Sequence, residues 1–298
     1  MTPEVRIPTV PVTAIIAAYQ RIGQTLETLK RIEACRPIPD EIIVHVDGHQ
    51  TMCGDAIRQA FPEIKVFTSS ESIGPGGGRN RLISEARNEW VASFDDDSFP
   101  LDADYFGRVA ALFAKYPEAA ILRAAIYHQG ESINPDRGSA EWVADFIGCG
   151  CAYRRSVFLK TSGYVPLTVA YGMEEVDIGL RLVANGHKIL KTPWLRVYHD
   201  TRLRHHANPD IVAASIANRA LLAFLRYPVS LWPVGAVQCL GRIRFLLKQG
   251  RSEGIWQGIG MIPRYIWSKR QLRRPLSCAS VIAFLKLRRQ PVQLESQG

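Results

Sequence analysis

Four apolar segments of strand length in the first 100 residues constrain the fold of this chain more than any other feature. They are Pro11–Tyr19, Glu41–Gly48, Ile64–Phe67 and Val91–Pro100, and helical patterns alternate with them. Uninterrupted apolar runs are typical of strands that are covered on both faces of a parallel sheet. The alternation predicts a doubly wound, mostly parallel α/β sheet, whose ligands bind beyond the carboxyl ends of the strands.

Three consecutive carboxylates, Asp95, Asp96 and Asp97, follow the fourth apolar segment. Adjacent acids repel one another, so a bound cation best explains them. Side chains alternate along a strand, so we expect Asp95 and Asp97 to face the same side, roughly 6–7 Å apart. Carboxylates and water suit a hard cation, which predicts a Mg²⁺ or Mn²⁺ site open to phosphate oxygens. Taken alone, an acidic turn at a strand end explains the same residues.

A glycine-rich segment, Ser72–Arg81, opens a predicted helix through Leu82, Ile83 and Ala86. Glycines before a helix N-terminus expose backbone N–H groups to a phosphate, and Arg79 adds positive charge. The segment matches neither the dinucleotide nor the P-loop pattern. A flexible turn is about as good an interpretation.

Small residues mark a further segment, Ala144–Arg155, which we predict to be a strand close to a ligand; packing against a neighbouring strand explains its glycines nearly as well. The polar segment Gly130–Ala140 before it is expected to be a loop. The segment Trp194–Asp200 is a last predicted strand, ending at His199. With His205 and His206 nearby, His199 by itself is better explained as a solvated histidine than as a metal ligand.

Three acids, Glu174, Glu175 and Asp177, open a predicted helix that stops at Asn185–Gly186. The helix dipole favours negative charge in a first turn, which accounts for the acids without any catalysis. An acid at a helix start beside a glycine-bordered cleft is also well placed to act as a general base.

Charge divides the chain near residue 200. From Thr201 onward 16 Lys and Arg face three acids, a net charge of +13, so the first 200 residues carry −4 of the total of +9. Helices are expected here, and Tyr227–Gly241 is uncharged but too short to span a membrane. Cations mixed with aliphatics and tryptophans are typical of helices in a membrane interface, although a packed helical subdomain with a solvated basic face fits equally. A nucleic-acid partner is not expected, because no known reader motif is present.

Six scattered cysteines lack disulfide or zinc-ribbon spacing, and no secretory signal is visible before Pro11, so we expect reduced thiols and a cytoplasmic protein.

Together these segments resemble a family 2 glycosyltransferase of the GT-A fold. The resemblance spans about residues 10–200 and depends on the order and spacing of several motifs. It implies a catalytic domain over residues 1–200 and a helical, basic extension over residues 201–298. The motifs are Ala18–Tyr19, Val46–Gly48, Gly74–Asn80, Asp95–Asp97, Gly148–Gly150 with Arg154–Ser156, Glu174–Asp177 with Leu180–Arg181, and His199.

The resemblance implies a nucleotide-sugar donor as partner, with Tyr19 and Asp47 holding its base and ribose. Mg²⁺ or Mn²⁺ would be held by Asp95, Asp97 and His199. The implied donor-binding residues are Tyr19, Arg21, Asp47, Gly78, Arg79, Asn80, Asp95, Asp96 and Gly150.

Family members usually carry Glu-Asp where this chain has Glu174-Glu175, so the catalytic base maps to Glu175, with Glu174 and Asp177 as other candidates. One displacement at the anomeric carbon would then invert its configuration. If the extension binds membrane, we expect a lipid-linked or envelope glycan as acceptor, at the inner face of the plasma membrane. A catalytically inactive nucleotide-sugar-binding or scaffold protein is the alternative. Nucleotidyl transfer fits poorly, because no glycine- and lysine-rich segment follows the first strand.

Overall fold

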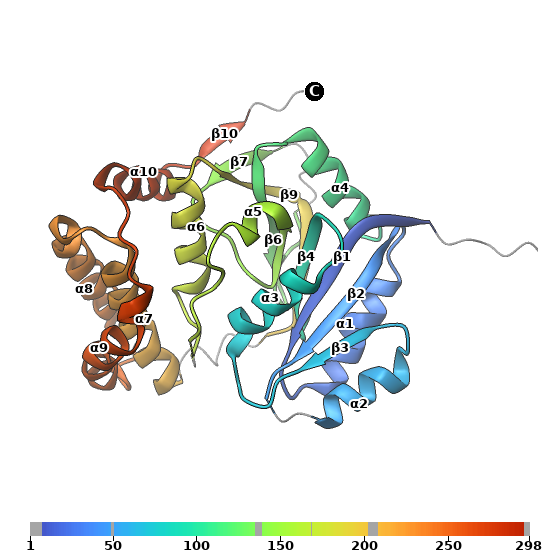
Figure 1. Cartoon of the computed structure of the whole chain (residues 1–298), viewed down its shortest axis with the longest axis horizontal. Helices are drawn as coiled ribbons and strands as arrows, with labels where there is room; N and C mark the ends of the chain where they lie inside the picture. The colour runs from blue at the N-terminus through green and yellow to red at the C-terminus, as the bar shows by residue number, and fades with distance from the viewer. Residues whose placement is uncertain (1–7, 49–50, 135–138, 168, 202–207, 295–298) are drawn as a thin grey trace, which may run out of the picture.

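The computed structural model describes residues 8–48, 51–134, 139–167, 169–201 and 208–294. One mixed sheet of ten strands runs through the molecule, with helices on both faces and a group of helices at one end (Figure 1). This is the predicted α/β architecture with a helical C-terminal part.

The half of the sheet that carries the acidic strand ends is parallel, in the order β3-β2-β1-β4. Ala17 pairs with Asp95 and Ala18 pairs with Val46, so the strands end level with one another. The polar residues that follow therefore meet at one edge, as the apolar segments predict. These strands are β1 (Thr9–Ala18), β2 (Ile38–Val46), β3 (Lys65–Thr68) and β4 (Trp90–Asp95).

The other half is mixed. The strand β8 lies antiparallel between β4 and β6, and β6 is parallel to β9. Short strands pair antiparallel with β9 or with one another. Their bounds are β5 (Ser98–Pro100), β6 (Ala119–Tyr127), β7 (Ala140–Val143), β8 (Gly150–Arg154), β9 (Lys188–His199) and β10 (Val292–Leu294).

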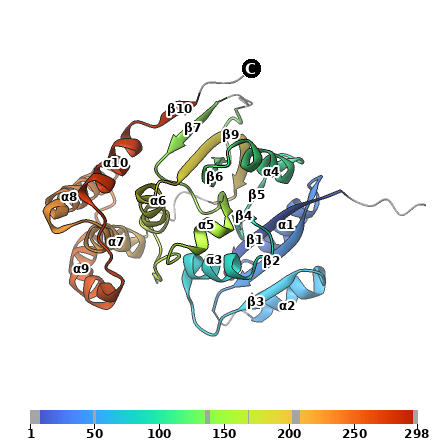
Figure 2. The ribbon, with the colours of Figure 1, turned by 45° about the horizontal axis from the view of Figure 1, so that its top comes forward.

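Helices lie on both faces of the sheet (Figure 2), and two clusters of buried apolar side chains join them to it. One face is covered by α1 (Ile22–Glu33), α2 (Thr51–Ala60) and α4 (Tyr105–Lys115). The other is covered by α3 (Gly74–Glu85), α5 (Arg155–Leu159) and α6 (Glu174–Ala184). Because both faces are buried, the central strands need the continuous apolar runs seen in the sequence.

Two local predictions are corrected. The segment Ala144–Arg155 is a strand only over Gly150–Arg154, because Ser93 and Ser98 hold the carbonyl groups of Gly148 and Cys149 in a loop before it. The glycine-rich segment opens a helix as predicted, and its glycines lie inside α3, which begins at Gly74. The segment 130–140 is predicted to be a loop, but its last residue, Ala140, is the first residue of β7. Residues 135–138 of this segment lie outside the described residues.

The C-terminal part returns to the sheet after four helices. β10 pairs with β7, bringing Val292 opposite Trp142. The uncharged segment after Tyr227 forms a short 3₁₀ turn, Val229–Leu231, and half of α8; Pro233 lies in the first turn of α8, where its missing N–H is not needed. None of the described helices is both long and apolar enough to cross a bilayer. The helices are α7 (Pro209–Arg226), α8 (Trp232–Lys248), α9 (Ile255–Lys269) and α10 (Cys278–Arg289).

A buried ion pair joins α6 to α7. The Asp177 carboxylate accepts hydrogen bonds from Arg181 one turn along α6 and from Arg226 at the end of α7, and the side chains of Asp177 and Arg226 are 1% and 2% exposed. Removing one partner of such a pair leaves an uncompensated buried charge.

We expect Asp177→Asn to lower the free energy of unfolding by about 3–5 kcal/mol, because two arginines lose their counter-charge in a dry environment. Urea denaturation of the purified proteins measures this change. The matched control is Glu85→Gln, since the Lys65–Glu85 pair is 62% and 44% exposed and its loss should cost less than about 1 kcal/mol. If the two substitutions lowered the free energy of unfolding equally, the buried pair would contribute no more to stability than the exposed one.

Candidate active site

The ends of β1, β2 and β4 open onto a hollow of about 560 Å³. Such a volume lies within the range of about 300–1,000 Å³ that is common for small-molecule sites. Of the predicted site residues, seven line it: Tyr19, Arg21, Asp47, Asp95, Asp96, Asp97 and His199.

Asp47 lies at the end of β2 and caps α3. Its carboxylate accepts hydrogen bonds from the backbone N–H groups of Ile73, at 2.8 Å, and Gly74, at 3.0 Å, and from the hydroxyls of Ser69 and Ser72. Although burial opposes it, these bonds hold the pKa of Asp47 below its ordinary value. The start of α3, predicted to receive a phosphate, therefore contacts a carboxylate of the chain itself.

Close packing accounts for the glycines of α3. A Cβ at Gly76 would lie 2.5 Å from Oε1 of Glu174, and one at Gly78 would lie 2.9 Å from Nδ1 of His45. Gly74 has a φ of +70°, which other residues adopt only with strain.

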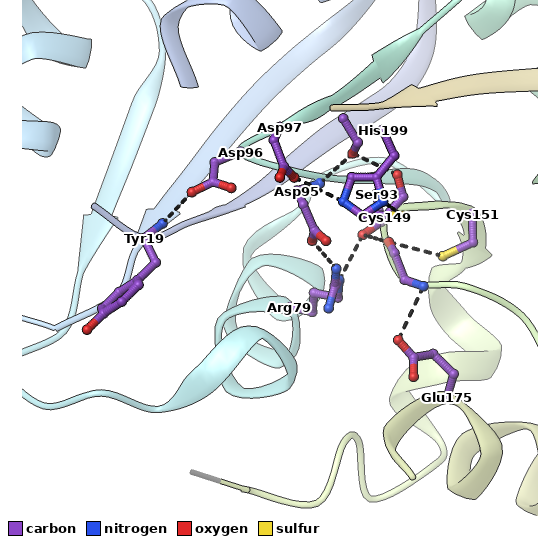
Figure 3. Close-up of polar contacts among 12 residues, drawn as sticks. Tyr19, Arg79, Ser93, Asp95, Asp96, Asp97, Cys149, Cys151, Glu175 and His199 are labelled. Atoms are coloured by element: carbon purple, nitrogen blue, oxygen red, sulfur yellow. Dashed lines mark hydrogen bonds and ion pairs between the residues drawn. The ribbon is translucent and has the colours of Figure 1, made fainter. Parts of the chain in front are cut away.

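The three aspartates diverge, as strand alternation predicts, although β4 ends at Asp95 (Figure 3). Asp96 points toward Tyr19, whose N–H donates to it at 3.0 Å, while Asp95 and Asp97 lie near His199. Arg21 contacts both Asp96 and Asp97. Burial raises the pKa of Asp96 to about 7, against the opposing effects of the Tyr19 N–H and Arg21.

His199 is held beside Asp97 by the pairing of β5 with β9, which puts Ser98 opposite His199. Its Nε2 lies 3.1 Å from Oδ1 of Asp97. Burial works against charge on both groups, but their contact prevails: the pKa of Asp97 is lowered and that of His199 is raised.

The donor set around His199 fits a divalent cation. Asp95, Cys149 and His199 each offer one atom, and these atoms lie within 4.8 Å of one another, with Asp97 on the other ring nitrogen of His199. Carboxylate, imidazole and thiol groups are all metal ligands. The two carboxylates also have counter-charges within the chain, since Arg21 pairs with Asp97 and Arg79 pairs with Asp95. Cys149 is not among the predicted site residues, because only the pairing of β8 with β4 brings it here.

Glu175 approaches the same region from α6 (Figure 3). Its Oε1 accepts a hydrogen bond of 3.3 Å from the Gly148 N–H. A Cβ at Gly148 would lie 2.7 Å from the Arg79 guanidinium carbon and 2.9 Å from Oε1 of Glu175, so a side chain there would displace the ends of both. Burial raises the pKa of Glu175 despite the neighbouring charge of Arg79. Arg79 itself pairs with Asp95.

The other two acids of α6 have different surroundings. Glu174 is buried against Gly76, and burial together with the charge of Glu175 raises its pKa. Asp177 is taken up by the ion pair with Arg181 and Arg226 described above.

Four predicted donor residues do not line the hollow: Arg79, which is buried against Asp95, and Gly78, Asn80 and Gly150, which serve packing and support. Asn80 instead holds the backbone of Tyr164 through two hydrogen bonds, and a Cβ at Gly150 would lie 2.2 Å from Ile126. His205 and His206 lie outside the described residues.

Comparison with known proteins identifies the family. Residues 13–161, half of the chain, match the model of glycosyl transferase family 2. The chain belongs to this family. It is a glycosyltransferase, as the sequence motifs predict. A stretch of 88 residues is 30% identical to the succinoglycan biosynthesis protein ExoO of Rhizobium meliloti (strain 1021) and covers 29% of this chain and 25% of ExoO, so the match spans about a quarter of that relative.

Solved structures share the fold of this glycosyltransferase. The mannosyltransferase PcManGT from Pyrobaculum calidifontis, in complex with GDP-Man and Mn²⁺, has a TM-score of 0.59 at 14% identity, covering 94% of this chain and 87% of its own. GalNAc-T7 with UDP, GalNAc and Mn²⁺ has a TM-score of 0.61 at 14% identity, and the match covers 90% of this chain and 59% of GalNAc-T7. S. aureus TarS 1–349 in complex with UDP-GlcNAc has a TM-score of 0.54 at 14% identity, and the match covers 88% of this chain and 92% of that TarS chain. The GT-A fold is thereby confirmed.

We expect Asp47→Ala to lower the free energy of unfolding by about 2 kcal/mol, because α3 loses a charged cap. The folded-state pKa of Asp47 is lowered, so its stabilisation is present above the unfolded value near 3.8 and is lost as pH falls through the folded value. The stability difference between the two proteins should therefore stay constant from about pH 8 to about pH 5 and shrink only in stronger acid. Urea titrations over this range test it; a difference that grows in acid would contradict it.

Proposed function

We propose that this glycosyltransferase moves a sugar from a nucleotide-diphosphate donor to an acceptor hydroxyl, with a divalent cation and with inversion at the anomeric carbon. One observation carries the proposal. A cation-binding group built on Asp97 and His199 and a carboxylate of raised pKa, Glu175, lie on either side of Arg79 and Gly148. Groups for charge acceptance and for proton removal thus lie close together.

The donor would lie along the strand ends. Tyr19, half exposed beside Asp96, offers a ring for stacking on the base, and Asp96 offers a carboxylate to the ribose hydroxyls. Arg21 lies beside Asp96 and Asp97 and can turn its charge to the diphosphate. The relatives PcManGT and TarS were solved with GDP-Man and UDP-GlcNAc, which supports this class of donor.

A divalent cation, Mg²⁺ or Mn²⁺, held by Asp97 and His199 with Asp95 and Cys149 close by, would neutralise charge on the departing diphosphate. Arg79 keeps Asp95 in place and adds positive charge. Glu175 takes the proton of the acceptor hydroxyl as its oxygen attacks the anomeric carbon from the face opposite the diphosphate. One carboxylate and one displacement give inversion.

Glu175 is the proposed base, because Glu174 is buried against α3 and Asp177 is bound by two arginines. The acceptor in this proposal is a lipid-linked or envelope glycan, in keeping with the biosynthetic role in the name of ExoO. Its site of action is the cytoplasmic face of the plasma membrane.

We expect Glu175→Gln to lower kcat by about 100- to 10,000-fold, because the amide cannot accept the proton. Donor binding, read as a thermal shift, should be retained. Glu174→Gln should keep most of its turnover, and Glu85→Gln, an exposed glutamate on α3, is the neutral control. Full activity of Glu175→Gln would remove the proposed mechanism, and loss confined to Glu174→Gln would reassign the base.

We expect UDP, GDP or dTDP to raise the melting temperature in the presence of Mn²⁺, since a ligand that binds only the folded state stabilises it by about 2.7 kcal/mol at roughly 100 times its Kd. Asp97→Asn should abolish the metal-dependent part of the shift. Differential scanning fluorimetry with and without the metal measures both effects. Absence of any shift with all three nucleotides would contradict the donor assignment.

A further inference from the structure

The helices α7, α8 and α9 lie together on the far side of α6 from the sheet (Figures 1 and 2). They enclose an apolar groove of about 480 Å³, with α7 as its floor and α8 and α9 as its walls. No charged side chain lines this groove. Among its lining residues are Ala220, Phe224, Leu240, Ile243, Ile259 and Ile262.

Small residues and a hairpin shape this groove. A Cβ at Gly235 would lie 2.5 Å from Cβ of Ala223, and one at Gly258 would lie 2.6 Å from the carbonyl oxygen of Ala213, so both α8 and α9 approach α7 closely. Leu246 and Ile255, near the turn that joins α8 to α9, are buried against the start of α7. The groove is therefore filled by side chains at the hairpin end.

Further apolar side chains are exposed on the two helices that form the walls, and we call them the rim. Val237 and Leu240 on α8 are 67% and 64% exposed, and Trp256 and Trp267 on α9 are 84% and 68% exposed. Trp256 and Trp267 are eleven residues apart, which places them on one side of α9. Exposed tryptophans and aliphatics that rim an apolar groove indicate a surface that another apolar body covers.

Positive charge is concentrated on the helices that form the walls of the groove and on the segment after them. Residues 232–274 carry nine Lys and Arg and a single acid, Glu253. Arg244, Lys248 and Arg264 are exposed, and within the described part of the chain none of the nine is in a salt bridge. The charge is thus available to an anionic partner.

We propose that this groove and its rim dock on an anionic phospholipid bilayer, with a lipid hydrocarbon chain in the groove. A bilayer supplies both components of the match, since hydrocarbon covers the apolar surface and anionic headgroups meet the cations. A second copy of the chain would bring like charges together, and the groove offers a nucleic acid no polar contact.

The docking surface is joined to the active site through α7. Asn218, fully buried on α7, donates hydrogen bonds to the carbonyl groups of Val169 and Tyr171, at 3.0 and 3.1 Å. This segment leads directly into Glu174 and Glu175. The part of this inference that concerns the acceptor rests on the proposed function: a lipid-linked acceptor would be presented beside the catalytic acids.

Vesicle co-sedimentation tests the docking surface. The protein should bind vesicles that contain phosphatidylglycerol and not vesicles of phosphatidylcholine alone. Leu240→Asp, which puts a charge into the groove, should weaken binding about ten- to hundred-fold. Reversing charge with Arg244→Glu and Lys248→Glu should weaken it about fivefold or more for each charge. Met52→Asp on α2, 75% exposed and remote in sequence, is the matched control and should bind normally.

Two further readouts separate the outcomes. Brominated acyl chains should quench tryptophan fluorescence, and less so in Trp256→Phe. The proposal would be overturned if wild-type protein failed to bind anionic vesicles. It would also be overturned if size-exclusion chromatography showed a dimer that Leu240→Asp dissociates. The nucleotide thermal shift is measured on the same samples: a normal shift without vesicle binding leaves the transferase function standing, and vesicle binding without a shift leaves only the docking surface.

Discussion

Compensation of buried carboxylate charge governs the architecture of this protein. Four aspartates meet at the ends of β2 and β4, where desolvation makes each unpaired charge costly. Each has a partner: Asp47 accepts from the N–H groups of α3, Asp96 and Asp97 share Arg21, and Asp95 pairs with Arg79. The placement of α3, and of the loop after β1, follows from these contacts.

The same compensation makes the cleft suitable for a charged ligand. Arg21 pairs with Asp96 and Asp97 at the hollow, and the buried Arg79 pairs with Asp95. Gly148 permits this arrangement, because any side chain there would push apart Arg79 and Glu175. Structural support and proposed chemistry therefore depend on the same few atoms.

The C-terminal helices are more than an attachment. Arg226 compensates Asp177 inside α6, Asn218 holds the segment before Glu174 and Glu175, and β10 extends the sheet. The extension thus stabilises the helix that carries Glu175. The proposed membrane-docking surface lies on these helices, so it would be joined by direct contacts to the helix that carries Glu175.

The sequence by itself determined the central buried strands and the sheet edge at which the acids gather, because apolar runs and the acids that end them are local patterns. It also placed Asp95–Asp97, Glu175 and His199 among the site residues. Only the tertiary structure brought Cys149 beside His199, tied Asp177 to Arg226, turned the Gly74 N–H toward Asp47 and returned β10 to the sheet. These contacts join residues distant in sequence, and their partners are chosen by strand register and by the cost of leaving a buried charge or N–H unpaired, which no local pattern records.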